Sequence, residues 1–356
     1  MYVKEIYVHP VKSFGGVKVE ESEVDEYGFK HDRRFMVCEA DKNDATKLKF
    51  LTQREYPQFT LVECSIDEDK NLLTLSYPPE NMNVSVPLVP SDDVIKKCPV
   101  EDTLIWGEYP KSIDLGKAFP EVGPFLAAIR GKDAKSSKQR ITLVYHHLPR
   151  GVRRGLTPED RKTIDRSYPQ SSYQDYYPGN LINEKSLWDL DKRVQETTNG
   201  EVRLAPRNFR PNMVIADIEN AWDEDHWKRV QIGEHEWIVA CRNGRCQVTT
   251  VNLKEGRFER THEPLKTMQK FRRIDPGLKY TPCFGMNLVQ VDSHSKVRVG
   301  DKLTVLSTGE HYYPAEYDFP DLHQKRARQQ KQALVGLTVL LTVLIAWITA
   351  IRYRLN

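Results

Sequence analysis

Two cysteines lie within six residues of each other in the stretch 239–250, beside two arginines and two threonine hydroxyls. Cationic side chains stabilise a thiolate, and Arg245 directly precedes Cys246, so this sulfur is suited to be a nucleophile or a soft-metal ligand. The alternative is two inert thiols beside a hairpin. An apolar run precedes the cysteines, the β-branched run Gln247–Val251 follows them, and Asn243-Gly244 between them is a strong hairpin signal.

A second candidate is the turn that follows the first strand-like segment, where Lys12 and Ser13 precede Gly15-Gly16. An ammonium, a hydroxyl and unobstructed backbone N–H groups at one place suit a phosphate or another anion. A plain hairpin with a solvated lysine is the alternative.

Two further stretches carry arginines at the edges of apolar segments. Arg33 and Arg34 open the segment that continues with Phe35, and because side chains alternate across a strand, at most one of them faces a given pocket. Arg210 can donate two hydrogen bonds to a phosphate, and Pro211 fixes the turn between it and Asn212. An ordinary turn before a buried strand explains the second stretch equally well.

The elements that must position these residues are mostly strands, so we expect a β-rich α+β fold. In the first hundred residues, short β-patterned segments separated by turn residues predict a barrel or sandwich, with strands at 2–8, 17–24, 34–38, 59–66 and 71–76. The helical patterns are few, at 122–129, 186–194 and 264–271. The polar run 131–140 predicts a domain boundary, which divides the chain into 1–130 and 131–310.

Composition excludes some classes of protein. The six cysteines show no paired spacing, which favours reduced thiols in a cytosol-facing body. Residues 321–356 contain six Lys and Arg and one carboxylate, while the whole chain has a net charge of only +3. The body is therefore close to neutral, which argues against a nucleic-acid-binding protein.

The C-terminal part predicts a membrane anchor. Residues 333–351 are uncharged, and a helix of that length spans about 28 Å, close to the thickness of a bilayer core. We expect a transmembrane tail anchor at 333–351 behind a polar tether at 311–332. The basic end, Arg352-Tyr353-Arg354, favours the mitochondrial outer membrane over the endoplasmic reticulum.

Taken together and in order, the motifs resemble those of a known family. They are His9-Pro10-Val11-Lys12-Ser13, Asp32-Arg33-Arg34-Phe35, Asn208-Phe209-Arg210-Pro211-Asn212 and the Arg245-Cys246 pair followed by Thr249-Thr250, with support from Leu51-Thr52-Gln53-Arg54. The chain resembles MOSC-domain proteins with an N-terminal MOSC-associated domain, and in particular the mitochondrial amidoxime-reducing component family. This resemblance implies a MOSC-type β-barrel preceded by a β-rich N-terminal domain.

The resemblance also implies a molybdenum cofactor of the molybdopterin type, with Cys246 as the metal ligand and catalytic centre. The residues that would bind the cofactor are Lys12, Ser13, Arg34, Arg210, Asn212, Arg245 and Thr249. Asp175 and Tyr177 are the candidate proton donors. Animal members of the family carry a small hydroxyl pair where this chain has Asp175-Tyr176-Tyr177-Pro178, so the corresponding pocket wall is bulkier here.

The activity that the resemblance implies is the two-electron reduction of N-hydroxylated compounds such as amidoximes and hydroxylamines. The sequence contains no ferredoxin cysteine spacing, no dinucleotide-binding fingerprint and no haem-attachment motif. Electrons must then come from a partner, and the resembled family implies cytochrome b5 and its NADH-dependent reductase. The alternatives are a membrane-tethered cofactor carrier, a sulfur-transfer protein and a purely structural tether.

Overall fold

The computed structural model describes residues 1–42, 44, 47–131, 138–147, 150–151, 170–292 and 294–313, all of which belong to one compact unit. The predicted membrane span at 333–351 and residues 314–332 of the predicted tether lie outside the described residues. Within the described part of the chain, no helix is both long and apolar enough to cross a bilayer.

A closed barrel forms the centre of the first half, with strand order β10-β11-β12-β5-β6. All six residues of β5 are buried, as expected for a strand with packed side chains on both faces. Its strands are β5 (Phe35–Ala40), β6 (Lys47–Phe50), β10 (Val100–Leu104), β11 (Lys111–Asp114) and β12 (Ile141–His146). The barrel predicted as one possibility for this half is confirmed.

Further elements pack on this barrel and share its core. The helix α2 (Val122–Arg130) buries Phe125, Leu126 and Ile129, and β8 alternates buried and half-buried residues with a period of two. The other elements here are the three-stranded sheet β7 (Glu63–Asp67), β8 (Leu72–Tyr77) and β9 (Met82–Pro87), the helix α1 (Asp92–Lys97), and the 3-10 turns η1 (Pro57–Leu61), η2 (Pro78–Glu80) and η3 (Leu115–Lys117).

An eight-stranded sheet dominates the second half of the described chain, in the order β2-β1-β16-β15-β21-β18-β17-β23. Its strands are β1 (Tyr2–Val8), β2 (Val17–Val19), β15 (Gly179–Asn183), β16 (Met213–Ala216), β17 (Trp227–Ile232), β18 (His235–Gly244), β21 (Cys283–Gln290) and β23 (Leu303–Thr308). Every residue of β21 is buried, because this strand lies between β15 and β18. The start of β23 also lies beside the start of β1, since Val3 N–H donates to the Asp301 carbonyl at 2.9 Å, Leu303 N–H donates to the Met1 carbonyl at 3.1 Å and Tyr2 bridges Lys302. This return of the last strand to the first is consistent with the barrel expected in the second half.

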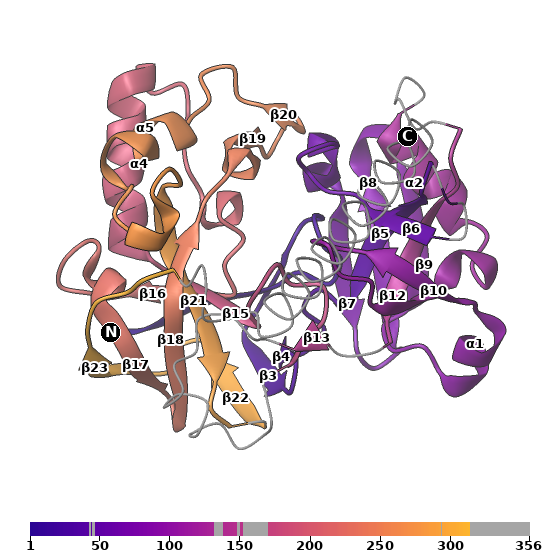
Figure 1. Cartoon of the computed structure of the whole chain (residues 1–356), viewed down its shortest axis with the longest axis horizontal. Helices are drawn as coiled ribbons and strands as arrows, with labels where there is room; N and C mark the ends of the chain where they lie inside the picture. The colour runs from indigo at the N-terminus through magenta and orange to yellow at the C-terminus, as the bar shows by residue number, and fades with distance from the viewer. Residues whose placement is uncertain are drawn as a thin grey trace, which may run out of the picture. The chain divides into compact units, whose positions relative to one another are not determined.

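The first strand of the chain belongs to this second sheet. Figure 1 shows the N-terminus among the orange strands of the second half, and β1 pairs antiparallel with β16. Ile6 packs in the core of that sheet, whereas Val11 packs in the core of the barrel. The chain thus crosses from one core to the other directly before Lys12. The division into 1–130 and 131–310 stays a prediction. The strand β12 follows residue 130 in the chain but pairs with β5 and β11 of the first barrel.

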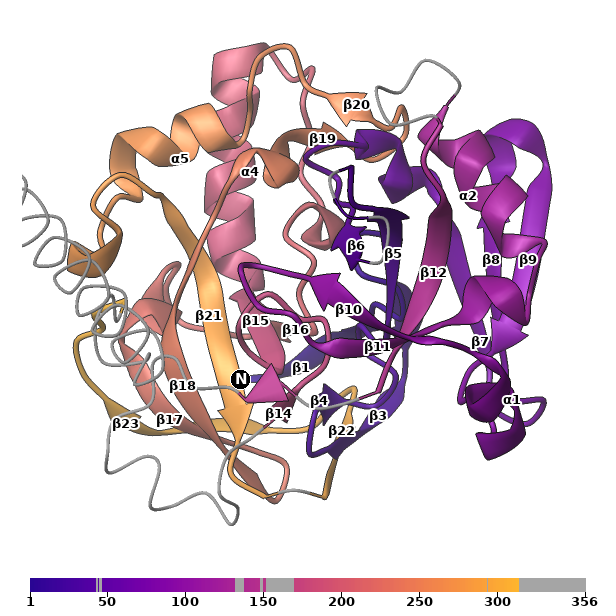
Figure 2. The ribbon, with the colours of Figure 1, turned by 45° about the vertical axis from the view of Figure 1, so that its right-hand side comes forward.

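Two helices cover part of the second half, α4 (Glu184–Thr198) and α5 (Leu265–Phe271), as Figure 2 shows. The side chain of Asn183 caps α4 by accepting from Lys185 N–H, which satisfies one of the free donors of the first turn. The remaining elements are β3 (Glu21–Asp25), β4 (Gly28–Phe29), β13 (Arg150–Gly151), β14 (Gln170–Ser171), β19 (Val251–Asn252), β20 (Arg257–Phe258), β22 (Ser295–Arg298), η4 (Pro206–Asn208), η5 (Asp223–His226), η6 (Gln247–Thr250) and η7 (Pro276–Leu278).

The predicted helices and most predicted strands are confirmed to within a few residues. Three predictions were wrong in detail. The strand predicted at 59–66 is the turn η1 followed by β7, because Pro57 begins a 3-10 turn. The strand predicted at 17–24 is divided into β2 and β3. The strand predicted at 247–251 begins as η6, in which two threonine hydroxyls donate to backbone carbonyls and stabilise a turn.

Candidate active site

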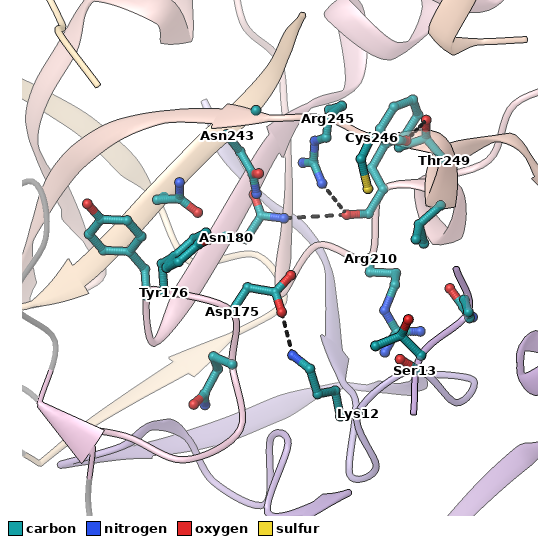
Figure 3. Close-up of a pocket in the computed structure, with 18 of the residues that line it drawn as sticks. Lys12, Ser13, Asp175, Tyr176, Asn180, Arg210, Asn243, Arg245, Cys246 and Thr249 are labelled. Atoms are coloured by element: carbon teal, nitrogen blue, oxygen red, sulfur yellow. Dashed lines mark hydrogen bonds and ion pairs between the residues drawn. The ribbon is translucent and has the colours of Figure 1, made fainter. Parts of the chain in front are cut away.

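One pocket of about 230 Å³ lies where loops of the barrel side meet the edge of the second sheet. Figure 3 shows side chains from both halves pointing toward a common space. The residues of its lining that carry the argument below are Lys12, Ser13, Arg33, Arg54, Trp106, Asp175, Tyr176, Tyr177, Asn180, Phe209, Arg210, Asn212, Arg245, Cys246 and Thr249. Every predicted site residue except Arg34 is among them.

The cysteine stretch is not a hairpin. The strand β18 continues through Asn243-Gly244 and pairs with β21, with register shifts before Cys241 and before Gly244. A Cβ at Gly244 would lie only 3.0 Å from the side chains of Leu278 and Thr281. The chain then turns at Cys246, and Thr249 donates its hydroxyl to the Cys246 carbonyl at 3.0 Å. The strand thereby delivers Cys246, and not Cys241, to the pocket.

The two thiols have different surroundings. Cys241 is fully buried and accepts a hydrogen bond from Asn287 Nδ2 at 3.5 Å. The Cys246 sulfur lines the pocket and accepts from Arg54 Nη2 at 3.4 Å. A cationic donor at this distance favours negative charge on sulfur, as a metal-ligating thiolate requires. The separation of roles that the sequence indicated is consistent with this geometry.

Arg245 does not point its hydrogen bonds at the neighbouring sulfur. Its Nε donates to the Phe284 carbonyl and its Nη1 donates to the Phe209 carbonyl, each at 2.8 Å. The buried Nη2 has no hydrogen-bond partner among the described residues. Burial lowers the pKa of Arg245 to about 10, because desolvation disfavours the charged form.

Lys12 is fixed by the loop that precedes β15. Its ammonium donates to the Tyr173 carbonyl at 2.8 Å and forms an ion pair with Asp175. Figure 3 shows the two side chains pointing toward one another. Partial desolvation in the pocket opposes ionisation of Asp175, although its side chain is still about half exposed, and Lys12, together with Arg54 and Arg33, holds its pKa well below the usual range. Asp175 is therefore a carboxylate at neutral pH and cannot donate a proton in that state.

The prediction for Arg34 needs a correction, because Arg33 takes its place in the pocket lining. Arg33 has a positive φ of 49° and lies before the strand begins, so the alternation of strand faces does not apply to it. Its guanidinium donates to Asp32 at 2.6 Å and to the Arg210 carbonyl at 3.1 Å. Arg34 instead forms an ion pair with Asp25 at 2.6 Å and stacks over the ring of Tyr27.

The turn at Arg210 faces the pocket from the second sheet. Its Nη1 donates to the Phe14 carbonyl, whereas its buried Nη2 has no partner in the described part of the chain. Burial, followed by the neighbouring cation Arg33, lowers the pKa of Arg210 to about 9. Asn212 is almost fully buried and holds the turn in place, since its side chain accepts from Asn180 N–H and donates to the Tyr7 carbonyl.

Tyr177 lines the pocket from the same loop as Asp175. Its ring is buried in a small apolar cluster with Ile238 and Val289 on the two central strands. Of the two predicted proton donors, Tyr177 is the one that is not held as a carboxylate by neighbouring cations.

The charge of the pocket is strongly unbalanced. Lys12, Arg33, Arg54, Arg210 and Arg245 line it with one carboxylate, Asp175, and Asp32 behind the lining pairs with Arg33, so cations remain in excess. Like charges gathered in a partly buried space repel one another unless an anion compensates them. The guanidinium nitrogens and the buried Asn180 Oδ1 that lack a partner among the described residues offer donors and an acceptor to such a group. The lining thus fits an anion with several hydrogen-bonding positions.

Sequence reasoning assigned no role to Arg54, Trp106 or Asn180. Arg54 lies in the supporting motif Leu51–Arg54, and that resemblance was the one signal that could have drawn attention to it. Trp106 and Asn180 stand in no motif. Only the packing of the barrel against the second sheet brings them to the cysteine.

The chain matches the models of two domain families. The MOSC N-terminal beta barrel domain matches residues 1–128 and the MOSC domain matches residues 169–304. The crystal structure of the YUAD protein from Bacillus subtilis has a TM-score of 0.29 and 8% identity, covering 85% of this chain and 92% of that one.

Two curated relatives share most of their length with this chain. Mitochondrial amidoxime-reducing component 1 of Homo sapiens is 28% identical over 316 residues, which cover 85% of this chain and 82% of the relative. Mitochondrial amidoxime reducing component 2 of Rattus norvegicus is 30% identical over 310 residues, which cover 84% of this chain and 81% of the relative. The chain therefore belongs to the family of MOSC-domain proteins that includes the mitochondrial amidoxime-reducing components.

Proposed function

We propose that the protein is a molybdenum-cofactor-dependent reductase of N-hydroxylated compounds such as amidoximes and hydroxylamines. One observation carries this proposal: a cysteine sulfur lies in a pocket lined by five cations and one carboxylate. The names of the relatives, amidoxime-reducing components, support an N-reductive role in general. The MOSC domain supports a link to molybdenum.

The residues of the pocket fit a molybdenum–pterin group that bears a phosphate. Thiolate is a suitable ligand for such a metal, and the Cys246 sulfur is accessible in the pocket. Buried guanidinium nitrogens of Arg210 and Arg245 have no partner in the described part of the chain, and neither has Asn180 Oδ1. A phosphate and a hydrogen-bonding heterocycle would satisfy both kinds of atom.

Each predicted residue then has a proposed task. Cys246 would ligate the metal, and its sulfur is held by Arg54. The phosphate and the pterin would be bound by Lys12, Ser13, Arg33, Arg210, Asn212, Arg245 and Thr249. Arg33 is proposed here in place of Arg34, whose guanidinium is occupied by Asp25.

When bound, this group supplies the two-electron chemistry that side chains alone lack. The overall reaction consumes two electrons and two protons, breaks the N–O bond and releases water. Ionised Asp175 fixes the ammonium of Lys12 and is not the proton donor. Tyr177, whose phenol lines the pocket, remains the proposed donor among the pocket residues.

The electrons are proposed to come from a separate redox protein, since the sequence contains no redox motif of its own beyond the proposed site. Cytochrome b5 and its NADH-dependent reductase are the proposed donors. We also propose that residues 333–351 anchor the protein in the mitochondrial outer membrane. Tethering at a membrane would raise the effective concentration of a membrane-bound donor. Fractionation of cells that express the chain with and without 333–351 tests this localisation.

The function is tested with the full-length protein from a host that makes molybdopterin. We expect stoichiometric molybdenum and pterin, and reduction of benzamidoxime with NADH, the reductase and cytochrome b5. At metal sites, loss of a residue that hydrogen-bonds to a metal ligand lowers activity by up to roughly 100-fold. Cys246→Ala removes the proposed ligand itself and should lower turnover by more than that. Cys241→Ala is the matched control, because it removes a buried sulfur from the strand that leads to Cys246 and should retain turnover.

Other outcomes identify the competing functions. Bound pterin without reduction by any donor would indicate a cofactor carrier. A persulfide on Cys246 found by mass spectrometry would indicate sulfur transfer. Unchanged molybdenum content and turnover in Cys246→Ala would contradict the assignment of the ligand.

A further inference from the structure

Two partly exposed aromatic rings line one side of the pocket, and each comes from a different half of the chain. Trp106 lies in the turn between β10 and β11 of the barrel, and Tyr176 lies in the loop before β15. Their ring centroids are 6.5 Å apart and their planes are inclined by 31°. The other aromatic residues of the lining, Tyr177 and Phe209, are buried. Trp106 and Tyr176 therefore provide the accessible aromatic surface of the pocket.

Trp106 is held in an unfavourable backbone conformation. Its φ of 50° lies in the left-handed region, which bulky residues rarely adopt. The turn is closed by reciprocal backbone hydrogen bonds between Ile105 and Glu108, each of 2.9 Å. Such a conformation persists only where surrounding contacts fix it. The ring of Phe50 packs at 4.9 Å from the indole, edge to face.

The indole is also tied to the charged groups of the site. Its Nε1–H donates to Asp175 Oδ1 at 3.2 Å. The guanidinium of Arg54 lies 4.7 Å from the centre of the Trp106 ring and donates to the Cys246 sulfur at 3.4 Å. The Arg54 side chain thus contacts both the Trp106 ring and the Cys246 sulfur. The ring and the sulfur are therefore close enough for one small substrate to reach both.

We propose that Trp106 and Tyr176 form a binding subsite for a flat aromatic group of the substrate, which directs the N-hydroxylated group toward Cys246. This proposal rests on the proposed function and adds the class of substrate. Apart from Val248 and Thr281, the open lining is mostly cationic or polar, so an apolar substrate body gains little elsewhere in the pocket. Aromatic rings attract flat rings beyond the effect of buried area alone. Aromatic amidoximes therefore bind more tightly than saturated ones of equal size.

The test compares benzamidoxime with cyclohexanecarboxamidoxime on the full-length holoenzyme. Trp106→Leu and Tyr176→Leu should each raise KM and the dissociation constant of benzamidoxime by about three- to tenfold. The saturated analogue should change by less than about twofold. Trp106→Phe should fall between wild type and Trp106→Leu. In each variant the ratio of the kcat values for the two compounds should be retained, because the ring contacts bind ground state and transition state alike and loss of the Trp106 contacts to Asp175 and Arg54 affects both compounds equally.

Tyr109→Leu is the matched control, since this exposed tyrosine follows the same turn but does not line the pocket. Calorimetric titration of the oxidised holoenzyme gives the dissociation constants without turnover. Absence of turnover with every donor would refute the proposed function while leaving the binding comparison intact. Equal losses for both compounds, or no loss for either, in Tyr176→Leu and Trp106→Phe would overturn the subsite even if Trp106→Leu failed to fold.

Discussion

Arg242 and Arg245 lie three residues apart, and each belongs to a different cluster of arginines. The two clusters differ in what compensates their charge. Arg242 is buried against Asp225 and Asp275, at 3.7 and 3.4 Å. Arg245 and Arg210 face the pocket, and each has a buried guanidinium nitrogen without a hydrogen-bond partner among the described residues. Arg242 Nε also lacks a hydrogen-bond partner among those residues, but the charge of Arg242 is compensated by two buried carboxylates. The difference between the clusters is therefore one of charge compensation.

The paired cluster has the features of a structural element. Arg272 donates to Asp225 at 2.8 Å and stacks over Trp222 at 4.0 Å. Arg242 also donates to the His311 carbonyl at 2.9 Å, so the cluster fixes the end of the described chain to β18. Removing one partner from a buried pair leaves an uncompensated charge, which is costly. A cation that is left unpaired by the fold, in contrast, is available to bind an anion.

The largest expected effect concerns the paired cluster. Asp225→Ala should lower the free energy of unfolding by about 3–5 kcal/mol, since it leaves Arg272 and Arg242 short of a carboxylate. Denaturant unfolding of the cofactor-free protein measures this loss. The control is Asp223→Ala on the same 3-10 turn. Among the described residues the Asp223 carboxylate accepts only from Asn220, so this substitution should lower the free energy of unfolding by less than about 1 kcal/mol. A normal stability with impaired cofactor retention would break the comparison.

A carboxyl beside the paired cluster should make stability depend on pH. Burial, followed by the charge of Asp225, raises the pKa of Glu224 from 4.5 to about 7. Between these values the folded protein binds a proton that the unfolded chain has lost, so stability falls as pH rises. The loss should reach about 3 kcal/mol at pH 7 and stay constant above it. Glu224 accepts from Asn183 and Ser186.

Glu224→Gln preserves those acceptor contacts and removes the titration. The difference in unfolding free energy between wild type and variant, measured by denaturant from pH 4 to pH 8, should grow over the interval between the two pKa values. Taking this difference cancels the titration of groups that both proteins share. A difference that does not vary with pH would show that Glu224 is not buried as a neutral acid.

The smallest effect on stability is expected in the pocket. Arg210→Gln removes a buried, partly unpaired cation, so the unfolding free energy of the cofactor-free protein should change by no more than about 1 kcal/mol. Retention of pterin by the holoprotein should fall by at least about tenfold. Arg34→Gln is the control: it should cost about 1 kcal/mol through its pair with Asp25 and leave pterin retention unchanged. Loss of pterin in Arg34→Gln with normal retention in Arg210→Gln would contradict this assignment and favour Arg34 as a cofactor-binding residue.

Much of the fold could be predicted because its signals are local. The alternation in Leu72–Tyr77 and the apolar spacing in Val122–Arg130 identify a strand and a helix without reference to the rest of the chain. The order of the strands in the second half could not be predicted in this way, since it depends on pairings between distant segments. The pairing of β1 with β16 is one of these.

Residues of the pocket could be predicted where they lie in a short motif of the resembled family. Cys246, Lys12 and Arg210 all lie in the pocket, as the resemblance implied. The sequence pointed to Arg34, whereas Arg33 lines the pocket. Arg33 has a left-handed backbone conformation, and the alternation of side chains along a strand does not predict the direction of a residue in such a turn. The charge of Asp175 could not be foreseen either, since it depends on Lys12, Arg54 and Arg33, which are far away in the sequence.

The sequence by itself determined the chemical groups of this protein: an available sulfur, an excess of cations beside it and the strands that end at each of them. Only the tertiary structure decided which cations stay unpaired and which aromatic residues border the sulfur. The physical reason is that desolvation and pairing are properties of surroundings. Arg242 and Arg245 are three residues apart, yet packing pairs the first with Asp225 and Asp275, whereas the second has no carboxylate in an ion pair with it among the described residues.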